Sequence, residues 1–487
     1  MLKTYLDYIK SDQETGLIIS AQGFTALAEG LPSARVGELV MMETGEVGIV
    51  NALGEESTEL LMVERGSAGK GSTVVLVGET LKVPCGKALL GRAINPLGKI
   101  LDGGADLEGV EMRSIEAEAP PIYKRSRIKD QFVSGVILAD LLVPIGQGQR
   151  EVVMGDAKSG KTTLLLQMML QAHRANIVGI YVAIGKTRSE IRRINSMFST
   201  GESAGSIAMI ASSSSDSTTT QYLAPYAGMA MAEYFRDSGQ DVLLVLDDLG
   251  NHAKAHREIS LLNGRLPGRD SYPGDIFFTH SRLLERAGCV KTEFGPKTIT
   301  LLPVIETQGG DLTGYVQTNL ISMSDGHILF DLETFYRGIR PAINIGLSVS
   351  RVGKQTQTKL QKQIATDVRG MIARYGEAKN FVRFGAELTD ATKELIQKGT
   401  AFEELIKQDV VTLMKIEEQL LVMSALMIGY FDTFAVATIL PHRAQMLELF
   451  RQPLYDPLRV ALGPDGKDDQ RHLLLGQFLE ASKNVLH

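Results

Sequence analysis

The sequence predicts a multidomain α/β protein with an N-terminal β-barrel, a central α/β domain and a C-terminal helical domain. Short β-rich runs fill residues 16–77, and from about residue 130 to 350 helical stretches alternate with apolar runs of strand length. After about residue 355, apolar residues recur at helical spacing. We place the predicted parts at residues 1–15 (a short N-terminal extension), 16–78 (barrel), 79–355 (central domain) and 356–487 (helical domain).

Composition excludes several classes of protein. The chain has 487 residues, of which 44% are hydrophobic and 22% charged, as in ordinary globular proteins. Its net charge of −6 speaks against nonspecific nucleic-acid binding, so no nucleic-acid partner is expected. Cys85 and Cys289 share no metal-ligand spacing, which predicts two reduced thiols. No apolar run is long enough to predict a membrane span.

The barrel and the central sheet are predicted from β-rich runs. The runs expected in the barrel are 16–20, 38–42, 47–50 and 73–77. Those expected in a mostly parallel sheet flanked by helices are 177–184, 207–211, 242–246, 298–303 and 326–330. The Ser- and Thr-rich run 212–220 predicts a loop at a strand end, which leads into a helix around residues 222–237.

Residues 155–162 fit the phosphate-binding pattern G-x-x-x-x-G-K-[ST], between an apolar strand (152–154) and an apolar-rich helix (164–170). Glycines let backbone N–H groups turn inward around phosphate oxygens, and the helix N-terminus adds positive potential. Lys161 is expected to reach the β- and γ-phosphates, and the Thr162 hydroxyl to coordinate Mg²⁺. The central domain is therefore a predicted P-loop nucleotide-binding domain. Its predicted phosphate-side residues are Gly155, Asp156, Ala157, Lys158, Ser159, Gly160, Lys161, Thr162 and Thr163.

A second acidic motif completes the predicted nucleotide site. A P-loop needs a carboxylate to hold Mg²⁺, directly or through water, at the end of a neighbouring strand. The apolar run 242–246 supplies that strand and ends in Asp247 and Asp248. We assign Asp247 to the metal, and we expect Asp248 to make a structural hydrogen bond.

From about residue 16 onward, the chain resembles the alpha subunits of F-type ATP synthases. The segments that carry this resemblance are 144–151, 221–228, 233–237, 259–262, 266–269, 272–275, 280–286, 338–344 and 347–353. It implies a RecA-like central domain, and an alternating hexameric ring of alpha-type and catalytic beta-type subunits around a central rotary shaft. The whole complex would couple ion transport to ATP synthesis or hydrolysis.

The resemblance also implies a location and further partners. The chain would be a peripheral membrane protein on the cytoplasmic face of a bacterial or organelle-encoded energy-coupling membrane, linked indirectly to the membrane ion-translocating sector. A peripheral stalk subunit is a further expected partner. The segment ahead of the barrel, which docks that stalk in alpha subunits, is shorter here than alpha subunits usually carry.

Position 186 distinguishes catalytic from non-catalytic chains in this family. Catalytic beta subunits carry a water-activating Glu after the strand that corresponds to 181–185, and alpha subunits carry Gln. This chain carries Lys186, which cannot act as a carboxylate base. Glu190 lies about 6 Å further along a helix and is expected to miss the water. The resemblance thus implies a non-catalytic site that binds ATP or ADP with Mg²⁺.

The resemblance assigns roles to four more residues. Arg351, in segment 348–351, corresponds to the arginine that alpha subunits send into the neighbouring beta subunit's active site, where guanidinium bonds bidentately to phosphoryl oxygens. Arg340, Pro341 and Gln408 fit the adenine side of the nucleotide site. Val410 stands where a second Gln is usual.

Two lysines depart from the alpha pattern. Ala157 and Lys158 replace a usual Arg-Gln pair, so that Lys158 and Lys186 bring two unusual ammonium groups near the expected phosphates. Either they tighten phosphate binding, or one of them pairs with an acidic neighbour; the sequence leaves both alternatives open.

Three other functions compete with the alpha assignment. A homohexameric export-type ATPase predicts Glu at position 186. An RNA translocase predicts a basic, aromatic barrel, whereas residues 16–77 hold one Phe, Phe24, and neither Tyr nor Trp. A diverged alpha-type paralogue in an atypical rotary ATPase is the third alternative.

Overall fold

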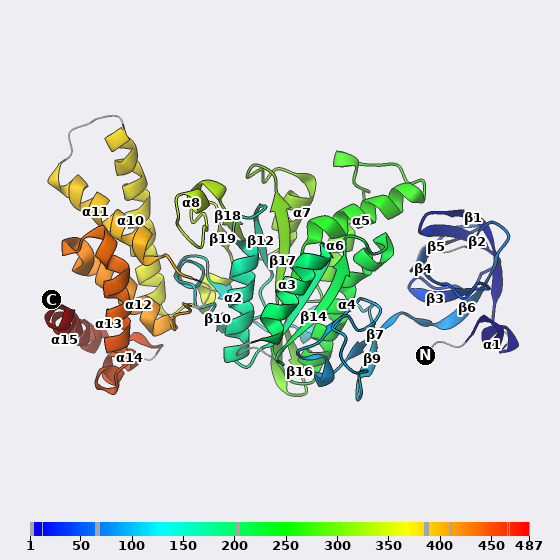
Figure 1. Cartoon of the computed structure of the whole chain (residues 1–487), viewed down its shortest axis with the longest axis horizontal. Helices are drawn as coiled ribbons and strands as arrows, with labels where there is room; N and C mark the ends of the chain where they lie inside the picture. Colours follow the sequence, from blue (N-terminus) through cyan, green and yellow to red (C-terminus); the bar gives the residue numbers. More distant parts are fainter. Residues whose placement is uncertain are drawn as a thin grey trace.

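The computed structural model describes residues 4–486 except 12, 64–68, 201–204, 384–388, 410–411, 465 and 467. Three parts follow one another along the long axis of the molecule (Figure 1). The barrel lies at one end, the central sheet with its helices lies in the middle, and the C-terminal helices lie at the other end. The predicted fold class is confirmed.

The barrel closes through six strands in the order β1-β2-β5-β4-β3-β6. They are β1 (Thr15–Gln22), β2 (Thr25–Glu29), β3 (Glu38–Met42), β4 (Val47–Leu53), β5 (Thr58–Met62) and β6 (Thr73–Thr80). The closed barrel adds β2 and β5 to the four predicted runs. Inward-facing apolar side chains such as Ile18, Val40 and Leu60 are fully buried. The short helix α1 (Tyr5–Lys10) packs on β6, where the Tyr5 hydroxyl donates to Thr73 Oγ1 at 2.7 Å.

A nine-stranded sheet forms the centre of the chain, in the order β19-β18-β12-β17-β15-β13-β14-β8, with β16 beside β17. The strands are β8 (Ala93–Ile94), β12 (Glu151–Asp156), β13 (Val178–Lys186), β14 (Ile207–Ser213), β15 (Val242–Asp247), β16 (Gly288–Thr292), β17 (Gly295–Thr307), β18 (Gly326–Phe330) and β19 (Val349–Ser350). All neighbours pair in parallel except β16 with β17 and β19 with β18. Two small antiparallel pairs lie outside this sheet: β7 (Lys82–Cys85) with β9 (Glu111–Ser114), and β10 (Gln131–Phe132) with β11 (Ile145–Gly146).

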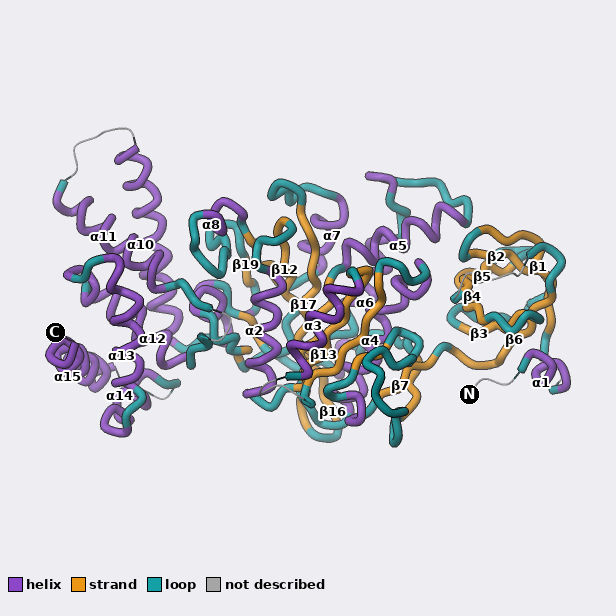
Figure 2. Tube along the Cα trace, in the orientation of Figure 1, coloured by secondary structure: helices purple, strands orange, loops and turns teal. Residues whose placement is uncertain are grey.

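Helices cover both faces of the sheet, as parallel strands with buried faces require (Figure 2). They are α2 (Lys161–Arg174), α3 (Arg188–Ser199), α4 (Thr218–Asp237), α5 (Leu249–Leu262), α6 (Ile276–Leu284), α7 (Tyr315–Met323), α8 (Leu332–Tyr336) and α9 (Gly353–Thr356). Buried apolar residues of one face, including Met168 and Leu302, form one core cluster. Those of the other face, including Leu244 and Phe235, form a second cluster.

One expectation about the Ser- and Thr-rich run was partly wrong. Strand β14 continues to Ser213, and α4 begins at Thr218, so that only residues 214–217 form the loop. The helix begins early because the Ser217 side chain accepts a hydrogen bond from the Thr220 N–H and caps it.

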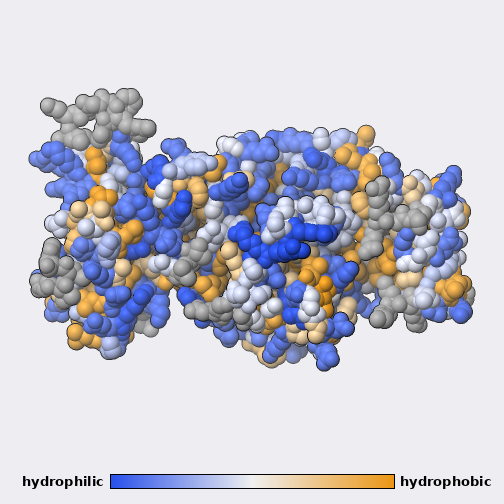
Figure 3. Space-filling model, viewed as in Figure 1, coloured by the Kyte–Doolittle hydropathy of each residue, from blue (hydrophilic) through white to orange (hydrophobic). Residues whose placement is uncertain are grey.

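The C-terminal part is helical: α10 (Lys359–Arg383), α11 (Asp390–Leu405), α12 (Ile416–Ile428), α13 (Ile439–Phe450), α14 (Asp456–Leu462) and α15 (Asp468–Leu486). Leu421, Phe450 and Phe478 are among its fully buried residues. Within the described part of the chain, every helix is too short or too polar to cross a bilayer. Hydrophilic side chains dominate the face seen in Figure 3, most densely over the central domain.

Candidate nucleotide site

The P-loop leaves the carboxyl end of β12 and runs into α2, as predicted. Gly155 has a φ of 148°, and a Cβ there would lie 2.7 Å from the Phe330 backbone oxygen. Gly160, the N-cap of α2, has a φ of 106°. Only glycine adopts such angles without strain, so these two glycines allow the loop to wrap closely. The uncapped first turn of α2 then presents free N–H groups, a preferred site for anions.

Lys161 lies inside this loop. Its Nζ donates hydrogen bonds of 2.7 Å to the carbonyl oxygens of Gly155 and Asp156, and it lies 4.0 Å from a carboxylate oxygen of Glu306. Burial lowers the pKa of Lys161, whereas Glu306 and Asp247 raise it. The ammonium group is thus held at the level of the loop backbone, where phosphate oxygens would lie.

Of the remaining loop residues, some bond to the rest of the protein or are buried, and others are exposed to solvent. The Asp156 carboxylate accepts hydrogen bonds from Thr307 Oγ1 (2.6 Å) and the Gly310 N–H (3.0 Å), which fixes the loop to the end of β17. The Ser159 hydroxyl is buried and has no hydrogen-bond partner among the described residues, so it remains available to a ligand. Ala157, Lys158 and Thr163 are exposed, and Thr162 is half-buried in the first turn of α2.

Asp247 ends β15, next to the end of β13. Its Oδ1 lies 2.8 Å from Lys186 Nζ, and its Oδ2 accepts a 2.5 Å hydrogen bond from the Tyr181 hydroxyl. Asp247 is 2% exposed. Of the two alternatives that the sequence left open, the structure has Lys186 paired with an acidic neighbour. Burial opposes the charge on Lys186, but the attraction of Asp247 and Asp248 outweighs it, and its pKa is raised.

Asp248 makes the structural hydrogen bond expected of it. It is the N-cap of α5, and its Oδ1 accepts a 2.6 Å hydrogen bond from the Asn251 N–H. Burial raises the pKa of Asp248 to about 6, although Lys186 opposes this shift. Asp248 therefore faces the site as a buried carboxyl group with a weakened tendency to ionise.

The fit of these residues to Mg²⁺ is uneven. The Thr162 hydroxyl lies in the first helical turn, where a P-loop residue can coordinate the ion. Both oxygens of Asp247 are already engaged, by Lys186 and by Tyr181, so Asp247 does not fit a metal in this arrangement. Among the described residues, no three His, Cys, Asp or Glu side chains are grouped to hold an ion.

Arg340 and Gln408, which the resemblance assigns to the adenine side, lie beside each other. The Gln408 N–H donates to the Arg340 carbonyl oxygen at 2.9 Å, and the Arg340 guanidinium stacks over the Phe335 ring at 4.5 Å. The Gln408 side chain is buried, and its amide bonds to backbone groups of Gly135, Ile137 and Thr412. Pro341 is half-buried next to Arg340. Val410 lies outside the described residues.

Glu190, the alternative base, is committed to a helix cap. Its carboxylate accepts hydrogen bonds from the Thr187 hydroxyl (2.7 Å) and the Thr187 N–H (3.0 Å), and it completes a capping box at the start of α3. The Thr187 hydrogen bonds hold the pKa of Glu190 below its usual range. Glu190 is exposed.

Arg351 lies at the amino-terminal end of the parallel strands, whereas the P-loop lies at their carboxyl end. It follows β19, and Ser350 pairs with Gly326, which in turn pairs with Glu151 at the start of β12. The P-loop lies at the other end of β12, and the five residue steps from Glu151 to Asp156, at about 3.3 Å each, separate the two ends of this strand by about 17 Å. The Arg351 side chain is exposed, and within the described part of the chain its guanidinium has no hydrogen-bond or ion-pair partner. Arg351 is therefore placed to act outside its own P-loop.

Sequence reasoning missed two residues of this site, Tyr181 and Glu306. Tyr181 reads as a core residue of an apolar strand, and only the adjacency of β13 and β15 turns its hydroxyl toward Asp247. Glu306 precedes Thr307 at the end of β17, where it pairs in register with Gly155. An acidic residue at the end of an apolar run was a usable signal for Glu306, as it was for Asp247.

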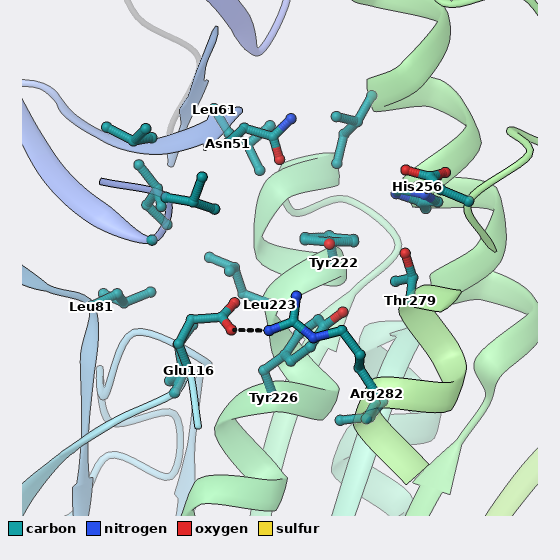
Figure 4. Close-up of a pocket in the computed structure, with 18 of the residues that line it drawn as sticks. Asn51, Leu61, Leu81, Glu116, Tyr222, Leu223, Tyr226, His256, Thr279 and Arg282 are labelled. Atoms are coloured by element: carbon teal, nitrogen blue, oxygen red, sulfur yellow. Dashed lines mark hydrogen bonds and ion pairs between the residues drawn. The ribbon is translucent and has the colours of Figure 1, made fainter. Parts of the chain in front are cut away.

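A separate cavity of about 650 Å³ lies between the barrel and the helices of the central domain (Figure 4). Tyr222 and Tyr226 reach it from α4, Asn51 reaches it from the barrel, and Glu116 lies 3.8 Å from Arg282 across it. Of the described residues that line it, none belongs to the P-loop. This cavity is distinct from the candidate nucleotide site.

Comparisons with known proteins also identify a nucleotide-binding domain in the part of the chain that holds the P-loop. The model of the ATP synthase alpha/beta family, nucleotide-binding domain, matches residues 135–350, and that of the ATP synthase alpha/beta chain, C-terminal domain, matches residues 357–461. The chain is 40% identical over 448 residues to ATP synthase subunit alpha of Neorickettsia sennetsu, covering 90% of this chain and 88% of that protein. It is 39% identical over 466 residues to subunit alpha of Caldanaerobacter subterraneus (95% and 91%), and 38% over 483 residues to that of Ehrlichia chaffeensis (97% and 94%).

Proposed function

Because the chain belongs to the ATP synthase alpha/beta family and matches alpha subunits over nine-tenths of its length, we propose that it is the non-catalytic, nucleotide-binding alpha subunit of a rotary F-type ATP synthase. It binds ATP or ADP at its own P-loop without hydrolysing it. It also donates Arg351 to the active site of a neighbouring beta-type subunit. The complex couples ion transport to ATP synthesis or hydrolysis.

The observation that carries the non-catalytic role is the ion pair between Lys186 and Asp247. A hydrolytic site needs a carboxylate to polarise the attacking water, and here an ammonium group occupies that position. The nearest alternative, Glu190, is held in its capping box. A homohexameric export-type ATPase would need a base at position 186, so the same ion pair speaks against that alternative.

The nucleotide would be held from two sides. Gly155, Asp156, Ala157, Lys158, Ser159, Gly160, Lys161, Thr162 and Thr163 would surround the phosphates. Arg340, Pro341 and the Gln408 segment would border the base, with the Arg340 guanidinium stacked on Phe335. The Thr162 hydroxyl is the group that could contact Mg²⁺ when the nucleotide carries the ion, while Asp247 remains bound to Lys186.

The position of Arg351 supports a role between subunits. The length of β12, about 17 Å, lies between Arg351 and the P-loop of the same chain, and its guanidinium has no hydrogen-bond or ion-pair partner among the described residues. In a closed ring, head-to-tail interfaces bring one edge of a subunit against the opposite edge of the next. The partners we propose are beta-type catalytic subunits, a central shaft and a peripheral stalk subunit. The chain would lie on the cytoplasmic face of the membrane, reaching the ion-translocating sector through these partners.

Co-assembly with beta-type chains of the same organism tests this proposal. The purified chain and the beta-type chain are mixed with ATP, and the mass of the product is measured by sedimentation. We expect an alternating hexamer that hydrolyses ATP, and no activity from this chain alone. A homohexamer of this chain that hydrolyses ATP by itself would contradict the proposal and favour the export-type alternative.

A further inference from the structure

Lys186 is aimed at Asp247 by a bend in its strand. β13 and β15 pair in parallel with Ala183 opposite Asp247, so Lys186 lies three residues beyond the carboxylate it binds. Gly185, with a φ of 62°, interrupts the strand, and the register with β14 shifts between Ile184 and Lys186. This bend favours glycine because a side chain is strained at such a positive φ. The bend brings Lys186 Nζ back to 2.8 Å from Asp247 Oδ1.

The resulting ion pair is largely shielded from solvent, and both oxygens of the carboxylate are engaged. The side chains of Lys186 and Asp247 are 13% and 3% exposed, unlike those of a solvated surface pair. The second oxygen of Asp247 accepts the Tyr181 hydroxyl. Each oxygen of Asp247 therefore already has a partner from its own chain, one of them positively charged, at the point where an ion or its water shell would have to bind.

Charged groups of both signs surround the expected terminal phosphate. Lys161 and Lys186 supply two positive charges, and the facing carboxyl groups are those of Asp247, Asp248 and Glu306. A divalent ion at Asp247 would meet the Lys186 ammonium at the same carboxylate, and the two positive charges would repel each other. An ammonium group has three N–H donors, so Lys186 can hold Asp247 with one and still offer donors to phosphate oxygens.

We propose that Lys186, anchored by Asp247, replaces the divalent cation at this nucleotide site, so that the chain binds ATP and ADP without needing Mg²⁺. The inference rests on the proposed nucleotide binding and adds to it the identity of the cation. Lys186 acts here as a phosphate-binding residue, and Asp247 as the residue that positions it. Asp247, at the acidic end of β15, would thus hold the Lys186 ammonium in place and would not bind a metal ion.

Equilibrium dialysis of the full-length chain with labelled ADP and ATP tests this inference, once with excess MgCl₂ and once with excess EDTA. For the unmodified chain we expect the two dissociation constants to agree within about threefold, well under the tenfold that 1.4 kcal/mol represents. Binding that requires Mg²⁺ would overturn the inference and leave the proposed function standing. Absence of binding in both buffers would overturn both.

Three variants sharpen the result. Lys186→Gln should weaken binding in EDTA by about tenfold or more, corresponding to about 1.4 kcal/mol, with part of the loss recovered by MgCl₂. Lys297→Gln is the matched control, because Lys297 lies 3.4 Å from Asp241, which precedes β15 at its opposite end. It should leave both constants unchanged.

Asp247→Asn keeps the inference falsifiable if Lys186→Gln fails to fold. It removes the charged anchor but keeps the Lys186 ammonium, so binding in EDTA should weaken less than in Lys186→Gln. A large loss of binding in MgCl₂, with none in EDTA, would show that Asp247 serves a metal ion and would overturn the inference.

Discussion

The positively charged side chains at the two ends of the central sheet differ in whether they are bonded to their own chain. At the P-loop end, Lys161 is buried, the Lys186 side chain is 13% exposed, and both are bonded to groups of their own chain. At the other end, Arg351 is exposed, and within the described residues its guanidinium has no partner. A cation that is already satisfied belongs to a preformed site, whereas an unsatisfied one is available to another molecule. The length of β12 keeps these two roles about 17 Å apart.

Removing Arg351 tests the difference with the largest expected effect. Arg351→Ala should lower the ATP turnover of the assembled complex by about 10³-fold or more, because an arginine finger of this type contributes that much. The dissociation constant for nucleotide of the isolated chain should change by less than about twofold, since Arg351 lies at the end of the strands opposite the P-loop. Steady-state hydrolysis and equilibrium dialysis provide the two readouts.

Arg351→Lys serves as the companion variant. It retains the charge and loses the planar, bidentate donor pair, so turnover should remain low. Near-normal turnover in both variants would show that Arg351 does not act on the neighbouring active site, and the comparison between the two ends would fail.

Removing Lys161 should affect the other end. Lys161→Gln should weaken ATP binding by the isolated chain by about 30-fold, since a hydrogen bond to a charged group contributes about 2 kcal/mol. The Lys297→Gln chain is again the control, because it loses a lysine distant from the P-loop. Unchanged affinity of the Lys161 variant would show that the phosphates bind elsewhere.

Two buried histidines, His252 and His280, differ from the lysines and the arginine at the ends of the sheet because burial favours their uncharged form. His252 Nδ1 lies 3.0 Å from His280 Nε2, and both rings are fully buried. Burial, with a smaller contribution from His256, lowers the pKa of His280 to about 3. Because the unfolded chain takes up this proton near pH 6.5, stability is present above that pH and is lost as the pH falls toward 3.

Between pH 7 and pH 5, this one group should remove about 2 kcal/mol from the free energy of unfolding. Urea unfolding at the two pH values measures the loss, and His280→Gln should reduce it. If the variant and the unmodified chain lose equal stability, His280 is not held neutral in the folded state.

The smallest expected effect belongs to Glu190. Glu190→Ala should lower stability by about 1 kcal/mol through loss of the capping box, and should leave hydrolysis by the isolated chain at background. Glu190→Gln, which can keep the cap, is the matched control. If the isolated chain hydrolyses ATP and Glu190→Gln lowers that rate, Glu190 is a base, and the proposal that this chain is non-catalytic is wrong.

Local patterns in the sequence predicted the P-loop, the strand that ends in Asp247 and the three-part fold. Each depends on neighbouring residues: glycines at fixed offsets, an apolar run, or a helical period. Even the misplaced start of α4 had a local signal, because Ser217 is a favourable N-cap three residues before Thr220.

Pairings between distant segments could not be predicted in this way. The contact of Lys186 with Asp247 depends on β13 lying beside β15 and on the bend at Gly185. The Gln408 amide is engaged by backbone groups near Gly135, more than 270 residues away. Such contacts follow from the order of strands and the packing of the helical domain, neither of which has a local sequence signature.

The most direct test of the account is single-turnover hydrolysis by the purified chain alone, preloaded with labelled ATP. The account predicts that the nucleotide is retained and uncleaved, because position 186 carries an ammonium group bound to Asp247 in place of a base. Release of labelled phosphate within seconds would contradict it, and would place this chain among the catalytic members of its family.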